Sequence, residues 1–245
     1  MSKPPSLTLY QYSGATPHTT FSPPCAKVQM ALHFKGLAFE VRNMGSPRHI
    51  RRLNPRGRVP VLRIGEELVA DSSDILDLLE ARFPEPPLVP SDPKARAEAR
   101  LWEDWADEVL YFYGANLRWR DDESFARLLP AMFGGMPRLL QASIGAYVRR
   151  MVVRRLKGQG VGLKDMTTCR RETWECFDLL AMRLDDRRWL AGEALSRADL
   201  AAAGVIDQFA STSLMPESAA QVAARPALVA WLERVHQAAP SVADP

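Results

Sequence analysis

In the first third of the chain, segments with the hydrophobic period of a β-strand alternate with segments that have the period of a helix. Apolar and polar residues take turns along residues 7–12, which predicts a β-strand. Residues 23–35 instead repeat their apolar positions every three or four places, as an amphipathic helix does, and Gly36 follows them. A second short strand is expected at residues 38–42, and a helical turn at residues 48–53.

The pattern then changes back to short strands. Residues 59–64 and 68–70 are β-rich and flank a Gly-Glu-Glu turn, so they predict a hairpin. A third helix is expected from about residue 72 to just before Pro84. The resulting order is β-α-β-α-β-β-α in about 80 residues. This order predicts an α/β domain with a small mixed sheet and helices on its faces.

A proline-rich segment separates this region from the rest. Residues 84–92 hold four prolines, which favour a stiff, extended linker. Strand patterns almost vanish beyond it. We therefore predict three parts: a domain of residues 1–83, a linker of residues 84–92 and an all-α domain of residues 93–245. The helices expected there cover residues 93–119, 124–133, 138–157, 165–185, 197–209 and 226–237.

Composition narrows the function classes. The 245 residues are 47% hydrophobic and 25% charged, as in an ordinary globular protein. A net charge of +3 is too weak to indicate nucleic-acid binding. The three cysteines are few and odd in number, which favours a reducing compartment. We expect a cytoplasmic protein, because no signal-peptide pattern and no apolar run long enough for a transmembrane helix is found. The four histidines lack metal-ligand spacing, so no metal site is expected.

The segment Phe21-Ser22-Pro23-Pro24-Cys25 is the first candidate for chemistry. It places Ser22 at the N-cap of the first helix and Cys25 in its first turn. Unpaired N–H groups and the helix dipole favour an anion there, and they lower the pKa of a thiol. Two interpretations fit the pattern. Ser22 and Cys25 are catalytic, or Ser22 only caps the helix and Cys25 is a small buried residue.

Two further segments offer groups for ligand binding. Pro60 lies within a predicted strand, which indicates an edge position or a cis peptide after Val59. A cis peptide would leave the backbone of Val59 free for a ligand. Asp71 and Ser72 begin the third helix, whose N–H groups can hold a carboxylate while Asp71 pairs with an ammonium. The alternative is a plain helix cap, supplied by Ser72 or Ser73.

A purely structural motif lies near residue 196. Ser196 and Asp199 have the spacing of a capping box, and Leu195 and Leu200 have that of the hydrophobic staple around it. We expect this motif to begin the helix of residues 197–209.

The order and spacing of these motifs resemble a cytosolic-type glutathione transferase. The resemblance covers about residues 7–240, and it is strongest in residues 53–80 and 190–208. It implies a thioredoxin-like N-terminal domain and a helical C-terminal domain. The Ser-Pro-Pro-Cys segment is similar to the theta-like and omega-like classes. An insertion at residues 134–164 resembles those of metaxin-like, divergent branches.

The resemblance also implies roles for particular residues. Ser22 matches the residue that activates the glutathione thiol, and Cys25 matches the second cysteine of a Cys-x-x-Cys ancestor. The implied glutathione contacts come from Arg58, Val59, Pro60, Asp71 and Ser72. Glutathione would be the co-substrate and a small hydrophobic electrophile the partner, with a homodimer expected as in many cytosolic members.

Three features depart from the family pattern. The loop before Ser22 is long, so Tyr10, Tyr12, Thr19 and Thr20 also remain candidates for the activating hydroxyl, and His18 is close in sequence. Asp71 is shorter than the usual Glu or Gln. Residues 149–157 contain four arginines and a lysine, which form either a solvated helix surface or an anion-binding or membrane-surface patch.

The leading hypothesis is a transferase that activates the glutathione thiolate for attack on a small hydrophobic electrophile. Glutathione-dependent thiol reduction through Cys25 is an alternative, although serine replaces the usual attacking thiol. A non-catalytic binding or scaffold protein with the same fold is the other alternative.

Overall fold

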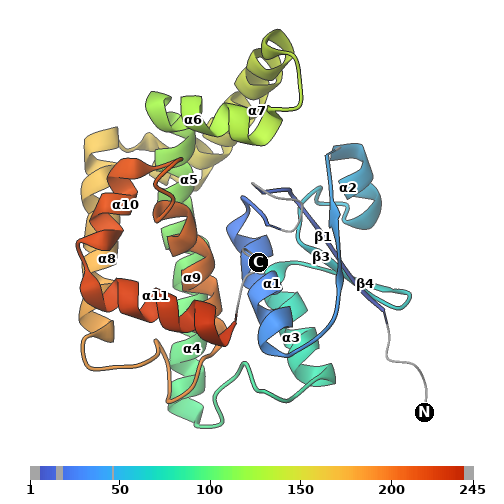
Figure 1. Cartoon of the computed structure of the whole chain (residues 1–245), viewed down its shortest axis with the longest axis vertical. Helices are drawn as coiled ribbons and strands as arrows, with labels where there is room; N and C mark the ends of the chain where they lie inside the picture. The colour runs from blue at the N-terminus through green and yellow to red at the C-terminus, as the bar shows by residue number, and fades with distance from the viewer. Residues whose placement is uncertain (1–5, 15–18, 46, 240–245) are drawn as a thin grey trace. The chain divides into compact units, whose positions relative to one another are not determined.

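The computed structural model describes residues 6–14, 19–45 and 47–239 (Figure 1). The chain forms two compact units. Unit 1 comprises Met1–Glu103, Trp189–Gly204 and Glu233–Pro245, and unit 2 comprises Asp104–Arg188 and Val205–Leu232. The domain boundaries expected at residues 83 and 93 remain a prediction.

Unit 1 contains a four-stranded mixed sheet with strand order β2-β1-β3-β4. Strand β1 runs parallel to β2 and antiparallel to β3, and β3 and β4 form the predicted hairpin. All five residues of β1 are buried, because this strand lies in the interior of the sheet. The strands are β1 (Leu7–Gln11), β2 (Glu40–Asn43), β3 (Val61–Ile64) and β4 (Glu67–Ala70).

Three helices accompany the sheet: α1 (Pro23–Phe34), α2 (Pro47–Leu53) and α3 (Ser72–Arg82). Helices α1 and α3 pack against each other, as Figure 1 shows. Each buries an apolar stripe, which includes Val28 and Leu32 in α1 and Leu79 in α3. The predicted order β-α-β-α-β-β-α and the α/β fold are therefore confirmed.

The remainder of the chain is helical, as predicted. It contains α4 (Pro93–Trp105), the π-helical turn η1 (Ala106–Leu110), α5 (Tyr111–Arg120), α6 (Asp122–Phe133), α7 (Arg138–Gln159), the 3-10 turn η2 (Val161–Leu163), α8 (Met166–Leu184), α9 (Arg197–Phe209), α10 (Pro216–Ala223) and α11 (Pro226–Ala238). The helix expected at residues 93–119 thus contains a π-helical turn.

Helix α10 was not predicted, because its eight residues are too few for a clear period.

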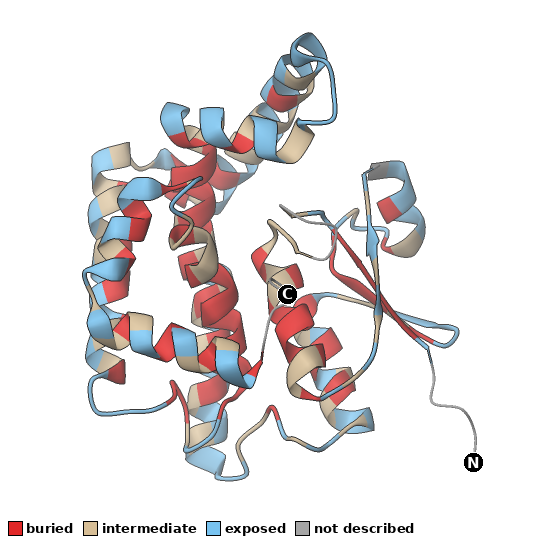
Figure 2. Ribbon diagram, in the orientation of Figure 1, coloured by how far each residue is buried: buried red, intermediate tan, exposed pale blue. Residues whose placement is uncertain are grey.

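Helix α5 lies at the centre of unit 2 (Figure 2). Seven of its ten residues are buried, including Phe112, Leu117 and Trp119. Gly114 makes this packing possible: a Cβ added there would lie 2.9 Å from Cζ of Phe209. The phenyl ring of Phe209 packs edge-on against Phe177 in turn. The buried residues of α5 also include the polar Asn116 and Arg118.

Within the residues that the structure describes, no helix is both long and apolar enough to cross a bilayer.

Candidate functional site

The strand register places three loop segments next to one another at one end of the sheet. Val61, the first residue of β3, pairs with Tyr10 near the end of β1 and with Ala70 at the end of β4. The chain before Val61, the chain after β1 and the chain after Ala70 therefore meet at the same end. These segments carry several of the residues predicted as a site.

Ser22 occupies the N-cap of α1, but its side chain does not cap the helix. Its backbone carbonyl accepts hydrogen bonds from the N–H groups of Cys25 (2.9 Å) and Ala26 (3.0 Å). Its side chain acts on the Cys25 thiol in the direction that lowers the thiol pKa. Ser22 is therefore the N-cap by position, as predicted, but its hydroxyl does not cap the helix.

Cys25 is completely buried, where it packs with Ile50 and Val59. Burial raises the pKa of its thiol to about 11, against the opposing hydrogen bonds of Ser22, Thr20 and the Tyr12 backbone. The helix N-terminus does not offset the cost of removing a thiolate from water. Near neutral pH the thiol is protonated, which weighs against Cys25 as a nucleophile. Its catalytic role remains a prediction.

The other candidate hydroxyls lie in different surroundings. Thr20 accepts a 3.1 Å hydrogen bond from the backbone N–H of Ser22. The backbone carbonyl of Thr19 accepts from Gln11 Nε2 at 3.1 Å. Tyr10 is buried, whereas Tyr12 is exposed. His18 lies outside the described residues. Ser22 and Thr20 are thus the two candidates whose side chains favour the ionised form of the Cys25 thiol.

The peptide bond between Val59 and Pro60 is cis, as the sequence suggested, and both residues are buried. Arg58 precedes them and its side chain is exposed. Its backbone carbonyl accepts a 2.8 Å hydrogen bond from Nδ2 of Asn54, a buried residue. Val59 and Cys25 belong to one apolar cluster, so the structure brings these two predicted site residues together.

Asp71 is the N-cap of α3, and its carboxylate accepts from the Ser73 N–H at 3.0 Å. The prediction that Ser72 or Ser73 supplies the cap is wrong. Asp71 has a φ of 97°, in the left-handed region that a non-glycine residue rarely adopts. Such backbone outliers are concentrated at functional sites. Asp71 is exposed, whereas Ser72 is buried.

A buried ion pair lies beneath the N-terminus of α3. The Lys27 ammonium is 2.6 Å from Glu103 Oε1, and both side chains are almost completely buried. Lys27 Nζ also donates to Ser73 Oγ at 3.1 Å and to Ser72 Oγ at 3.5 Å. Ser73 Oγ donates to Glu103 at 2.9 Å. The ion pair therefore ties α1 and α4 to the segment that begins α3.

Arg197 binds the same carboxylate. It donates to both oxygens of Glu103 and also forms an ion pair with Asp77 of α3. Burial opposes ionisation of Glu103, but the charges and hydrogen bonds of Lys27 and Arg197 outweigh it and lower the pKa of this carboxyl. Glu103 is therefore ionised at neutral pH.

Sequence reasoning missed these three residues. The position of Lys27 could have indicated a buried charge, because this lysine lies between Cys25 and Val28 in a helix that is mostly buried. A lysine in such a place is rarely buried without an acidic partner. Nothing local identified that partner, which comes from a distant helix.

The predicted capping box at Ser196 is present in modified form. Asp199 accepts from the Ser196 N–H at 3.0 Å, as expected, and from the Leu190 N–H at 2.9 Å. The Ser196 hydroxyl donates to the same carboxylate at 3.1 Å. All three residues are buried, so this motif is structural.

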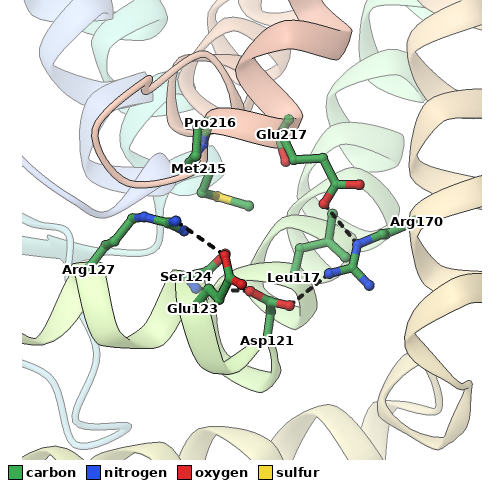
Figure 3. A pocket seen from close by; sticks show the side chains of 10 residues that line it. Leu117, Asp121, Glu123, Ser124, Arg127, Arg170, Met215, Pro216 and Glu217 are labelled. Carbon is green, nitrogen blue, oxygen red and sulfur yellow. Dashed lines mark hydrogen bonds and ion pairs between the residues drawn. The ribbon is translucent and has the colours of Figure 1, made fainter.

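Unit 2 contains a cavity of about 230 Å³ with charged walls (Figure 3). Arg170 joins Asp121 (2.7 Å) to Glu217 (2.9 Å) across it. Arg127 and Glu123 form a further pair at 3.2 Å. The five charges thus satisfy one another, and the volume is below the roughly 300 Å³ of a typical ligand pocket. We assign no ligand to this cavity.

The described part of the chain also contains no group of three His, Cys, Asp or Glu side chains placed to hold a metal ion.

Two family models match the chain. Residues 17–87 match "Glutathione S-transferase, N-terminal domain", and residues 143–238 match "Glutathione S-transferase, C-terminal domain". The protein therefore belongs to the cytosolic-type glutathione S-transferase superfamily.

Several known proteins are similar to it. Glutathione S-transferase 1 of Dianthus caryophyllus is 45% identical over 80 residues, which are 30% of this chain and 36% of that protein. Protein LigF of Sphingobium sp. is 38% identical over 96 residues, or 36% of this chain and 37% of that protein. The chain thus matches about a third of the length of these relatives.

Solved structures extend the similarity of fold. The crystal structure of the beta-etherase LigF superposes with a TM-score of 0.68 at 23% identity, covering 97% of each chain. Rice GST1 in complex with glutathione gives a TM-score of 0.64 at 24% identity, covering 96% of this chain and 88% of that one.

Proposed function

We propose that this protein binds glutathione in unit 1 and activates its thiol for attack on a small hydrophobic electrophile. The main observation in support is that Cys25, Val59 and the start of α3 lie close together. Cys25 and Val59 belong to one apolar cluster, and the strand register brings the chain before Val61 next to the chain after Ala70. Lys27 of α1 also donates a hydrogen bond to Ser72 at the start of α3. Rice GST1, whose fold is similar, was solved with glutathione bound. Family membership supports the same ligand.

Each end of glutathione has a chemically suitable partner in this arrangement. The exposed carboxylate of Asp71 can pair with the α-ammonium group, and the N–H groups that begin α3 can hold the adjacent carboxylate. The backbone of Val59, next to Pro60, is suited to the cysteinyl part. The exposed guanidinium of Arg58 suits the second carboxylate of glutathione.

The Ser22 hydroxyl would activate the thiol. It is not used for capping, and it is placed at the N-terminus of α1, where the helix dipole favours a negative charge. A hydroxyl that donates to a thiolate stabilises the charged form. Lowering a thiol pKa by about two units corresponds to about 2.7 kcal/mol. The thiolate would then attack the electrophilic carbon or sulfur.

Two alternatives differ in what Ser22 and Cys25 do. Thiol reduction through Cys25 would require a reactive thiolate, which complete burial and a pKa of about 11 disfavour. A scaffold protein would keep the fold and have no need of Ser22. We also propose a cytoplasmic homodimer, in keeping with the family, without assigning its interface.

Calorimetric titration of the purified protein with glutathione tests the binding step. We expect micromolar-to-millimolar affinity, reduced at least about tenfold in Asp71→Ala, which loses a charged hydrogen-bond partner. Ser143→Ala is a matched control, since its exposed hydroxyl only bonds a carbonyl of its own helix. Failure to bind glutathione at several millimolar concentration would refute the proposal.

A second experiment tests activation. Ultraviolet titration of the bound thiolate in wild type and Ser22→Ala measures the thiol pKa. We expect the variant to bind glutathione, with a bound-thiol pKa about two units higher. If the pKa is the same in both proteins, Ser22 is not the activating residue. If bound glutathione keeps its solution pKa in wild type, the scaffold alternative gains support.

A further inference from the structure

The positive charge of this chain is concentrated in one segment. Residues 124–164 contain eight Lys and Arg and no Asp or Glu. The rest of the chain contains the other 24 Lys and Arg and all 29 Asp and Glu. A modest net charge of +3 therefore hides a strongly cationic segment, and α7 forms most of it.

The orientation of α7 is set by its packed face. A Cβ on Gly145 would lie 2.2 Å from Leu129 Cδ1 of α6, so the two helices make close contact at this glycine. Leu156 is buried in the cluster around Trp119, with Val148 and Val152 packed against it. The side of α7 opposite these residues therefore faces away from unit 2.

Five of the six cations of α7 divide into two groups. Arg149 faces inward, where it donates to the carbonyls of Trp119 and Arg120 and pairs with Asp122. The Arg155 guanidinium lies over the ring of Phe112. These two stabilise the fold. Arg150, Arg154 and Lys157 are exposed and make no ion pair within the described residues.

Long apolar side chains share the outward side with the second group. Leu139 is 86% exposed, Tyr147 65% and Met151 50%. These residues are separated by multiples of four, so they follow one side of the helix. At 3.6 residues per turn they lie within an arc of about 120° that also contains the three outward cations. We name this surface the α7 outer face: Leu139, Tyr147, Arg150, Met151, Arg154 and Lys157.

We propose that the α7 outer face binds the surface of a membrane that contains anionic lipids. The cations would contact the headgroups, and Leu139, Tyr147 and Met151 would enter the boundary between headgroups and acyl chains. Arginine, lysine and tyrosine suit this depth because each combines an apolar body with a polar end. The absence of acidic residues from residues 124–164 removes local repulsion from anionic lipid.

A membrane fits this surface better than an acidic polypeptide does. The α7 outer face is a ridge of one helix. A polypeptide needs complementary shape to bury long side chains at little entropic cost, whereas fluid lipid adapts to a ridge. Attachment would be peripheral, since none of the described helices can span a bilayer. This proposal does not depend on glutathione binding.

Co-sedimentation with lipid vesicles tests it. We expect the full-length protein to bind phosphatidylcholine vesicles that contain phosphatidylglycerol, and to bind pure phosphatidylcholine vesicles much less. Raising the ionic strength to about 1 M, where the Debye length is about 3 Å, should release most of the protein.

Three variants locate the contact. Arg150→Gln/Arg154→Gln/Lys157→Gln should lower the partition coefficient roughly a hundredfold, at about fivefold per cation. Leu139→Ser/Tyr147→Ser/Met151→Ser should weaken binding at unchanged charge. The matched control is Arg48→Gln/Arg52→Gln/Lys94→Gln, which removes three exposed cations from unit 1 and should bind as wild type does.

Circular dichroism establishes that each variant is folded, and glutamine is a good helix former. Equal losses in the control and in the α7 cation variant would overturn the assignment, because net charge alone would then explain binding. No binding of wild type to the anionic vesicles would also overturn it.

Discussion

Replacing Glu103 by Gln would remove the carboxylate that lies between two buried cations. Lys27 and Arg197 both bind this carboxylate, and all three side chains are buried. The variant keeps the size of the side chain and part of its hydrogen bonding. Its effect therefore reports mainly on the negative charge.

The expected cost is large. Removing one partner of a buried ion pair costs about 3–5 kcal/mol, because it leaves an uncompensated charge away from water. For a chain of this length each kcal/mol shifts the melting temperature by about 2–4 °C. Glu103→Gln should therefore melt about 6–20 °C below wild type.

The exposed ion pair between Arg171 and Glu175 provides the control. Its atoms are 2.6 Å apart, but the two side chains are 60% and 55% exposed. Exposed pairs contribute about 0–1 kcal/mol. Arg171→Ala should therefore leave the melting temperature nearly unchanged, although the distance equals that of the buried Lys27–Glu103 pair.

The pH dependence gives a second readout. The pKa of Glu103 is held below its ordinary value of 4.5 in the folded protein. Its contribution to stability is complete above about pH 4.5 and is lost as the pH falls through the lower, folded pKa. Glu103→Gln should lack this part of the acid destabilisation. Urea unfolding between neutral pH and pH 3.5 measures it.

Differential scanning calorimetry at neutral pH gives the decisive comparison. If Glu103→Gln and Arg171→Ala melt within about 2 °C of each other, the buried charge contributes no more than an exposed one, and the reasoning is refuted.

Three shorter predictions concern other parts of the fold. Asp199→Ala should lower the free energy of unfolding by about 2–3 kcal/mol in urea, because it leaves buried N–H groups without an acceptor; an unchanged midpoint would contradict this. Gly114→Ala should cost about 1–3 kcal/mol by thermal melting, because its Cβ would meet the Phe209 ring, and a stabilised variant would show that the ring moves aside. Cys25 should resist iodoacetamide at neutral pH, because it is buried with a pKa of about 11, and peptide mapping that found fast alkylation would revive the thiol-reductase alternative.

Local sequence signals determined the order of elements. Alternation and helical periods are properties of neighbouring residues, so β1, α1 and the β3–β4 hairpin could be predicted within a few residues. The capping box at Ser196 and Asp199 is equally local, since its partners lie within four positions. The family motif at Val59-Pro60 also identified the one predicted cis peptide.

Local signals were ambiguous where several residues could play one role. Asp71, Ser72 and Ser73 are all good helix caps, and in the structure Asp71 is the one whose side chain caps α3. Helix α10 is short and has too few turns to produce a periodic pattern.

Only the tertiary structure decided the chemical environment of the site. The first turn of α1 predicts an acidic thiol at Cys25, but the packing of Ile50 and Val59 around it reverses the direction of the pKa shift. Glu103 and Arg197 meet across 94 positions of sequence. Burial and long-range charge pairing depend on which segments the fold brings together, and a linear pattern of residues does not contain that information.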